Sequence, residues 1–308
     1  MRRSFCQLFG VAMSLAAFQP GAAAQESLQA ALHGALQRDL ERVADRLDGV
    51  LGYAISDLST GESLTRLSDT VFPQASSIKL TVLLELLRQE QEGKLSLEEK
   101  HTIRRGEMTT GDPDPILNKL GDGTVSMSLH DLAVFMIVLS DNTATNILID
   151  RVGMERINAG IQRLGLKETK LRRRMIDLEA ARQGNENVST PREMMTLIEK
   201  VFRGDSLDAS HTQEFFRILR LPKDTYQSDF RRALPPDLVI ADKAGSLDAV
   251  RCDSGLIEIA GHPIILCVMT TYLQNGSEGE RAIEDVARLT YSYFSRLAKS
   301  SPYGRSIP

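Results

Sequence analysis

Two serines stand just before a lysine in the stretch QASSIKLTVLLELL, residues 74–87. A helix starting here would place Ser76 and Lys79 on one face, one turn apart, while Ser77 would point elsewhere. Apolar residues would lie on nearly every face of that helix, which predicts that it is buried together with the amine. Burial lowers the pKa of a lysine, and a neighbouring base makes a serine an effective nucleophile. Taken alone, the pattern is a weak signal and favours a serine helix cap and a lysine that extends to water.

Two further triplets carry polar groups that could join this pair. Ser140, Asp141 and Asn142, in VLSDNTATN, stand between two predicted helices, where the triplet by itself could simply cap a helix. The late stretch ADKAGS places Lys243 in a predicted strand, where by itself it could be an exposed edge lysine. Gly245 would let a ligand approach the strand backbone closely.

Together the three motifs resemble the S-x-x-K, S-D-N and K-T-G signature of class A β-lactamases and penicillin-binding proteins. They occur in that order, at a helix start, between helices and on a late strand. Residues 129–166 and the STPREM segment at 189–194 also resemble class A β-lactamases, and the resemblance covers nearly the whole chain after residue 24. It implies a β-lactamase-like fold of the α/β plus all-α class. In that fold a five-stranded antiparallel sheet is flanked by the terminal helices, and a helical domain is inserted.

The resemblance also implies catalytic roles for the first two motifs. Ser76 would attack a lactam or amide carbonyl and carry the acyl group. Lys79 would take the proton of that serine, directly or through water, and Ser140 would relay a proton to the departing nitrogen. These three residues are the expected acylation machinery.

Substrate-binding roles follow from the same resemblance. Asn142 would bind the amide of the substrate's side chain, and Lys243 its carboxylate, with Gly245 allowing close approach. Backbone N–H groups of the nucleophile and of Ser246 would form the oxyanion hole, and Arg251 would supplement the carboxylate site.

The strand motif departs from the family pattern, because Ala244 stands where a hydroxyl residue is usual. The substitution removes one hydrogen bond to the substrate carboxylate, worth about 1.5–3 kcal/mol for a charged acceptor. Ser246 or Arg251 could compensate for this loss.

A second departure concerns the loop that carries the deacylation glutamate in class A β-lactamases. This chain reads TKLRRRMIDLEAARQGNENVSTP, and alignment puts Met175 or Arg174 at the place of that glutamate. Neither residue is a base. Glu179, which we take as the candidate, and Asp177 are the nearby carboxylates that could substitute. The alternative is that they form ion pairs with the neighbouring arginines.

Hydrophobic periodicity predicts the elements that must position these residues. Strands from both ends of the chain would form one sheet, and the middle of the chain is mainly helical. The predicted elements are a helix over 26–47, two strands within 50–67, helices between 79 and 221, strands between 237 and 273, and a helix over 278–299.

This order of elements predicts two domains with a cleft between them. We expect an α/β domain from residues 25–75 and 230–308 and an all-helical domain from 76–229. Clefts between domains are favoured places for small-molecule sites.

The first 24 residues predict a secretory signal. Arg2 and Arg3 precede an apolar run at 8–18, and small residues lead to cleavage after Ala24. The run is shorter than the roughly 20 apolar residues that span a membrane. We therefore expect an exported protein, in the periplasm, with no membrane attachment after cleavage.

Composition narrows the remaining choices. The chain has 308 residues, 42% hydrophobic and 25% charged, which is typical of a soluble globular protein. Its net charge of −4 and the absence of a basic stripe argue against a nucleic-acid partner. A hairpin turning near AGHP would place Cys252 opposite residue 271 and not opposite Cys267, which favours two free buried thiols over a disulfide.

We therefore expect a serine acyl hydrolase that opens β-lactam rings through an acyl-enzyme at Ser76. It would be a monomer acting on a small molecule, without metal or organic cofactor. A D-alanyl-D-alanine peptidase that deacylates β-lactams slowly is the alternative, because losing a positioned base costs about 10²–10⁴-fold in the step it serves. A non-catalytic β-lactam sensor is a third hypothesis, but a sensor needs a physical link to its readout.

Overall fold

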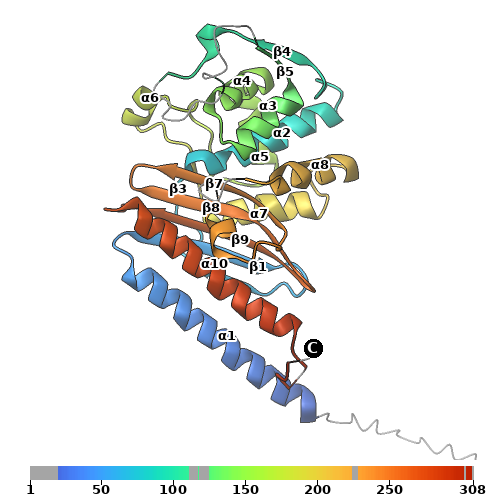
Figure 1. The fold of residues 1–308 in the computed structure, drawn as a ribbon, viewed down its shortest axis with the longest axis vertical. Coiled ribbons are helices and arrows are strands. Elements are labelled where there is room, and N and C mark those ends of the chain that lie inside the picture. The colour runs from blue at the N-terminus through green and yellow to red at the C-terminus, as the bar shows by residue number, and fades with distance from the viewer. Residues whose placement is uncertain (1–19, 111–116, 118–124, 224–227, 302, 307–308) are drawn as a thin grey trace, which may run out of the picture.

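Five antiparallel strands form the central sheet of the computed structural model, which describes residues 20–110, 117, 125–223, 228–301 and 303–306. The strand order is β2-β1-β9-β8-β7, so strands from both ends of the chain pair in one sheet (Figure 1). This arrangement confirms the predicted sheet. The strands are β1 (Val50–Asp57), β2 (Ser63–Arg66), β7 (Ile240–Leu247), β8 (Val250–Ile259) and β9 (His262–Thr271).

Helices cover both faces of the sheet. On one face, α1 (Pro20–Arg46) and α10 (Gly276–Ala298) lie side by side, with the short α9 (Asp229–Ala233) against α10 (Figure 1). On the other face, α7 (Pro191–Phe202) packs against β1, β8 and β9. Because both faces are covered, seven of the eight residues of β1 are buried.

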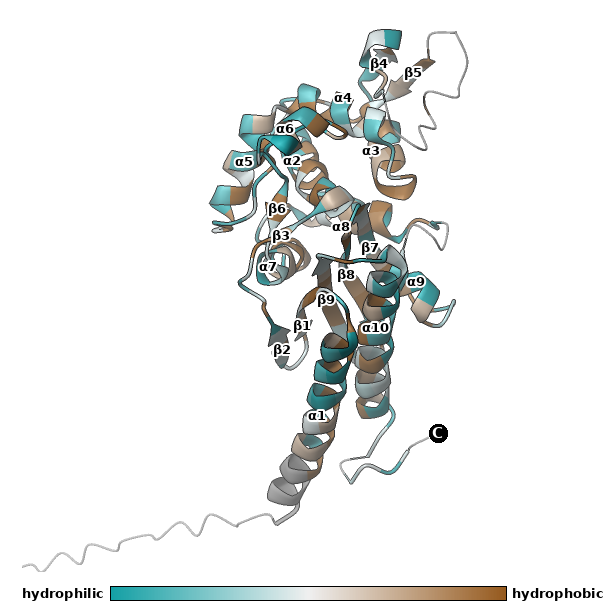
Figure 2. Cartoon of the chain, turned by 90° about the vertical axis from the view of Figure 1, so that its left-hand side faces the viewer, coloured by the Kyte–Doolittle hydropathy of each residue, from teal (hydrophilic) through white to brown (hydrophobic). Residues whose placement is uncertain are grey.

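A group of helices from the middle of the chain packs beyond the sheet, on the side of α7 (Figure 1). Its members are α2 (Lys79–Gln91), α3 (Leu129–Val138), α4 (Asn142–Val152), α5 (Met154–Arg163), α6 (Leu178–Arg182) and α8 (Ala209–Arg220). Figure 2 shows α3 mostly brown and α6 mostly teal, which agrees with the five buried residues of α3 and with the absence of buried residues in α6.

The middle of the chain is not purely helical, which corrects one expectation. β4 (Lys100–Ile103) pairs with β5 (Val125–Ser128), and β3 (Phe72–Pro73) pairs with β6 (Val188–Ser189). Strands of two to four residues are too short for hydrophobic periodicity to reveal. The division into two domains at the predicted boundaries stays a prediction.

The N-terminal helix begins earlier than expected. α1 starts at Pro20 and runs through the predicted cleavage point after Ala24, because alanines favour helix. Residues 1–19 of the predicted signal lie outside the described residues. In the described part of the chain, no helix combines the length and the apolar character that a membrane span requires.

Both cysteines of the sheet are free and buried, as the sequence predicts. The register differs from the expected one, since Cys252 pairs with Met269 and not with residue 271. The hairpin is tighter than AGHP suggests, because Ile259 already lies opposite His262.

Candidate active site

The predicted nucleophile lies on a short 3-10 turn, η1 (Ala75–Ile78), which runs directly into α2. Ala75 has a φ of 45°, a left-handed conformation that costs a non-glycine residue about 1–3 kcal/mol and persists only where the surroundings enforce it. Ser76 is half-buried, whereas Ser77 is fully buried. The Ser77 hydroxyl donates to the backbone oxygen of Lys243 at 2.8 Å. The two serines therefore have different surroundings.

Lys79 begins α2 and has no exposed surface. Its Nζ lies within hydrogen-bond distance of three oxygens: the backbone oxygen of Ser140 at 2.6 Å, the Oγ of Ser140 at 3.1 Å and Oδ1 of Asn142 at 2.9 Å. These acceptors hold the amine beside a hydroxyl, so a proton can pass between the two over one hydrogen bond.

The three residues of the S-D-N turn make different kinds of hydrogen bonds. Asp141 is the N-cap of α4, where its Oδ1 accepts from the backbone N–H of Ala144 at 2.8 Å and its Oδ2 from that of Leu117 at 3.2 Å. Ser140, with a φ of 54°, and Asn142 turn their oxygens to the lysine of α2. Helix capping is thus assigned to the middle residue, and the outer two are left to the site.

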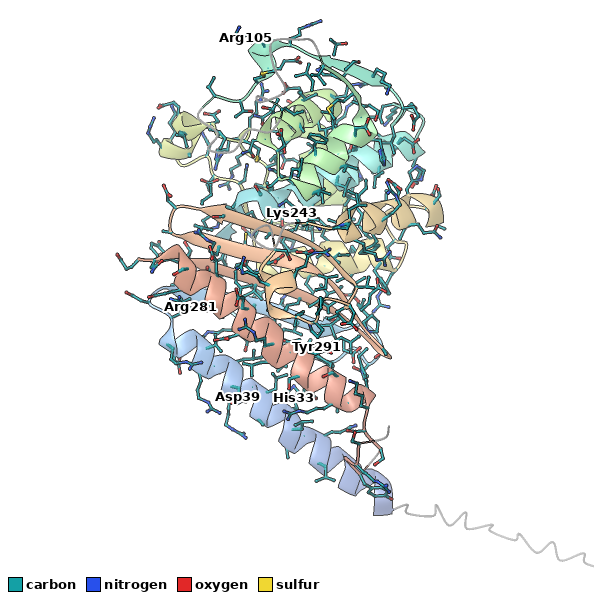
Figure 3. All side chains as sticks on the ribbon, in the orientation of Figure 1. His33, Asp39, Arg105, Lys243, Arg281 and Tyr291 are labelled. Carbon is teal, nitrogen blue, oxygen red and sulfur yellow. The ribbon has the colours of Figure 1, made fainter. Side chains whose placement is uncertain are left out.

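Lys243 lies on β7, where the sheet meets the helices of the middle group (Figure 3). Its residue is 1% exposed, and its Nζ donates to the backbone oxygen of Ala244 at 2.7 Å. Burial, with a further contribution from the nearby charge of Lys223, lowers the pKa of Lys243 to about 8. Near neutral pH the amine is a buried cation whose hydrogen-bond donors can serve an anionic ligand.

A buried ion cluster supports this strand from its other face. Asp242 pairs with Lys223 at 3.3 Å and with Arg231 at 3.2 Å, and the side chains of Asp242 and Lys223 are fully buried. Burial works to raise the pKa of Asp242, but the two cations hold it below its usual value. The carboxylate therefore stays charged directly beside Lys243 in the sequence.

Gly245 allows β7 to approach the nucleophile turn. A Cβ on Gly245 would lie 2.8 Å from the backbone nitrogen of Ser76 and 2.8 Å from the backbone oxygen of Gln74. Real side chains do not tolerate such distances to backbone atoms, so glycine is required here. Ser246, the next residue, is exposed. The structure thus brings the backbones of the first and third motifs into contact.

The expectation for Arg251 is corrected by the structure. Although it lies opposite Ser246 in the sheet, its Nε donates to Oε1 of Glu280 on α10 at 2.9 Å. Its Nη1 donates to the backbone oxygens of Leu247 and Val250, both at 2.8 Å. Successive side chains of a strand point to opposite faces, so the residue that faces the helical group is the next one along β8.

Glu179 is not brought to the site either. Its side chain is 68% exposed, and its carboxylate accepts from Arg182, on the same short helix, at 3.3 Å and from Gln183, which caps that helix, at 3.0 Å. Asp177, the other nearby carboxylate, caps that helix through the backbone N–H of Ala180 at 3.0 Å. Ion pairing was the expected alternative, and the partner is Arg182 instead of an arginine of the 172–174 run.

Met175 is held near the S-D-N turn by a residue that the motif search missed. Asn146, one helical turn after Asn142, accepts from the backbone N–H of Met175 at 2.8 Å and donates to its backbone oxygen at 3.2 Å. Met175 is buried, and Arg174 instead pairs with Asp150 at 3.0 Å. The spacing of four residues from Asn142 was the available signal for Asn146.

Metal ligation has no support in the part of the chain that the structure describes, where no cluster of three His, Cys, Asp or Glu side chains could hold an ion.

The chain is similar to β-lactamases along most of its length. Residues 35–294 match the model of the beta-lactamase enzyme family. A β-lactamase of Streptomyces fradiae is 30% identical, covering 82% of this chain and 83% of the relative, and β-lactamase SME-1 of Serratia marcescens is 27% identical, covering 92% and 94%. Among solved structures, a mutant of PBP-A in an acyl-enzyme complex with penicillin G has a TM-score of 0.76 and 27% identity, covering 86% of this chain and 97% of that one.

The left-handed backbone of Ser140 generates a prediction about stability. Replacing Ser140 by glycine or by alanine removes the same hydroxyl, but only glycine adopts a φ of 54° without strain. We expect Ser140→Gly to be about 1 kcal/mol more stable than Ser140→Ala, a difference of about 2–4 °C in melting temperature for a chain of this size. Thermal unfolding of the two variants side by side measures it, and an alanine variant of equal or greater stability contradicts the strain.

Proposed function

Because the chain belongs to the beta-lactamase enzyme family, as a serine hydrolase of the class A type, we propose that Ser76 is its nucleophile and opens β-lactam rings. The observation that carries this proposal is the buried amine of Lys79, hydrogen-bonded to the hydroxyl of Ser140 at 3.1 Å. Lys79 is buried beside the hydroxyl of Ser140 and lies one helical turn from the half-buried Ser76. This arrangement suits proton transfer during acylation.

Each proton transfer during acylation would be carried out by Ser76, Lys79 or Ser140. Lys79 accepts the proton of Ser76, directly or through water, while Oγ of the serine bonds to the lactam carbonyl carbon. The carbonyl oxygen becomes an oxyanion between the backbone N–H groups of Ser76 and Ser246. When the carbon–nitrogen bond breaks, Ser140 gives its proton to the nitrogen and takes one from Lys79. The lysine is then neutral again, and the acyl group stays on the serine.

Substrate binding would use the edge of the sheet. β7 is an edge strand, whose backbone groups can pair with an extended amide of the substrate. Lys243 would bind the substrate carboxylate, and Asn142 the amide of its side chain. Ala244 lacks a hydroxyl and Arg251 is bound to Glu280, so neither residue restores the lost hydrogen bond to the carboxylate.

Deacylation is the step that we propose to be slow. Met175 is buried near the S-D-N turn, where the family's glutamate is expected, and Glu179 is exposed on α6. Losing a positioned base costs about 10²–10⁴-fold in the step it serves. The buried Met175 favours the second candidate function, a D-alanyl-D-alanine peptidase of the penicillin-binding type. In such an enzyme the acyl group left by a β-lactam stays on the serine for a long time. From the predicted secretory signal we further propose that the protein is exported to the periplasm. There it would act as a monomer on peptidoglycan stem peptides.

Covalent labelling tests the nucleophile. Intact-mass spectrometry after mixing with penicillin G should show one added mass of the drug on the wild type and none on Ser76→Ala. Ser77→Ala is the matched control, which should still reach one adduct per chain. An adduct on the Ser76→Ala variant would exclude Ser76 as the nucleophile.

A carboxylate at position 175 should supply the missing base. We expect Met175→Glu to shorten the lifetime of the penicillin adduct by about tenfold or more, because a desolvated carboxylate has a raised pKa and is an effective base. Met175→Gln, of equal size without the base, should not shorten it. Glu179→Gln should leave the lifetime unchanged. If Glu179→Gln lengthens the lifetime instead, Glu179 is the substitute base.

The buried cation on β7 predicts a pH dependence. The pKa of Lys243 is about 8, so the amine loses its charge, and its attraction for a substrate carboxylate, as the pH rises through that value. The second-order rate constant of acylation should be about tenfold lower at pH 9 than at pH 7. In Lys243→Arg the decline should move to higher pH, because a guanidinium stays charged. An unchanged decline in that variant would assign it to another group.

A further inference from the structure

Ser77, the second serine of the S-S-x-K stretch, has no role in the chemistry described above, yet it is fully buried against the site. Its Oγ donates to the backbone oxygen of Lys243 at 2.8 Å and lies 3.3 Å from the Sγ of Cys252. Ser77 therefore connects the turn that carries the nucleophile to the strand that carries the third motif.

Cys252 makes a second connection between the same parts. It lies on β8 opposite Gly245 and has no exposed surface. Its Sγ is 3.1 Å from the backbone oxygen of Gln74, at the start of the turn, and 3.6 Å from the backbone oxygen of Gly245. Burial raises the pKa of this thiol to about 12, so the thiol keeps its single proton and donates it to the nearer oxygen, that of Gln74. The Ser77 hydroxyl donates its own proton to the backbone oxygen of Lys243.

Backbone hydrogen bonds do not provide this connection. Among the described residues, no hydrogen bond between backbone groups joins η1 to β7, whose partner in the sheet is β8. The turn contains the left-handed Ala75, which needs outside support to persist. A Cβ on Gly245 would meet the Sγ of Cys252, the oxygen of Gln74 and the nitrogen of Ser76, each at 2.8 Å. Turn, β7 and β8 therefore meet at one tightly packed point.

We propose that Ser77 and Cys252 are positioning residues for acylation, whose two side-chain hydrogen bonds hold the nucleophile turn against β7. The inference rests on the proposed function, because the groups that they place are the backbone N–H groups of Ser76 and Ser246. Oxyanion donors work only when they lie about 2.7–3.1 Å from the developing charge. A shift of about 1 Å in such a site can lower a rate about a hundredfold.

The chain provides a matched control in Cys267. Like Cys252, it is a free cysteine without exposed surface, and both belong to the same hydrophobic core. It lies one strand further from the turn, on β9 opposite Ser254. Truncation of either cysteine removes the same atom from the same core, so only loss of the connection to the turn distinguishes the two variants.

The experiment compares Cys252→Ala, Cys252→Ser, Ser77→Ala and Cys267→Ala with the wild type. Stopped-flow acylation by a chromogenic β-lactam separates the limiting acylation rate from the concentration for half-saturation, and urea unfolding measures stability. We expect Cys252→Ala and Ser77→Ala to lower the limiting rate about ten- to hundredfold, to change half-saturation less than twofold, and still to reach one adduct per chain. Cys252→Ser, which keeps a donor, should recover most of the rate.

Cys267→Ala should lose stability to a similar extent and acylate at the wild-type rate. Equal rate losses in Cys252→Ala and Cys267→Ala, or no rate loss in Cys252→Ala, would overturn the positioning role. Should Cys252→Ala fail to fold, Cys252→Val, which fills the space without a donor, decides in the same way. A wild type that no β-lactam acylates refutes the proposed function itself, which distinguishes that failure from a failure of this inference.

Discussion

The enclosure of one amine is the constraint on which the site depends. Lys79 has no exposed surface, and an ammonium or amine in such a place must find partners within the protein. The strained S-D-N turn supplies them, with oxygens of Ser140 and Asn142 at 2.6–3.1 Å. Helix α2 is packed on nearly every side, which leaves the lysine without exposed surface. The apolar residues around Lys79 therefore serve the proposed chemistry as well as the packing of the core.

The second dependence is between the helical group and the edge of the sheet. Gly245 removes the side chain that would separate β7 from the nucleophile turn. Ser77 and Cys252 then connect the two with side-chain hydrogen bonds. On the other face of β7, the buried pair of Asp242 and Lys223 and the layer formed by α1, α9 and α10 hold the strand in place. A rigid edge strand offers fixed backbone groups, which is what stabilisation of an oxyanion requires.

The loop before α7 is where this chain departs most from the pattern of its family. Asn146 fixes the backbone of Met175 one helical turn from the S-D-N residues, so the loop is placed close to the site but offers no base there. The carboxylates of the loop cap or flank the solvated helix α6. In the proposed mechanism, acylation therefore has its residues, whereas Met175 stands where a carboxylate would be expected to release the acyl group.

The sequence alone determined the fold family, the sheet and most helices, because motifs and hydrophobic periodicity are local signals. It also predicted Ser76, Lys79, Ser140 and Asn142 as site residues, and the structure joins the last three by hydrogen bonds. The sequence could not show which way Arg251 and Glu179 point. The alternation of side chains along β8 turns Arg251 toward α10, and α6 leaves Glu179 in solvent. Ser77, Cys252 and Asn146 also escaped the motif search, since their partners lie 29 to 178 residues away along the chain. Only tertiary packing brings such groups together, because a hydrogen bond between distant segments leaves no periodic trace in either one.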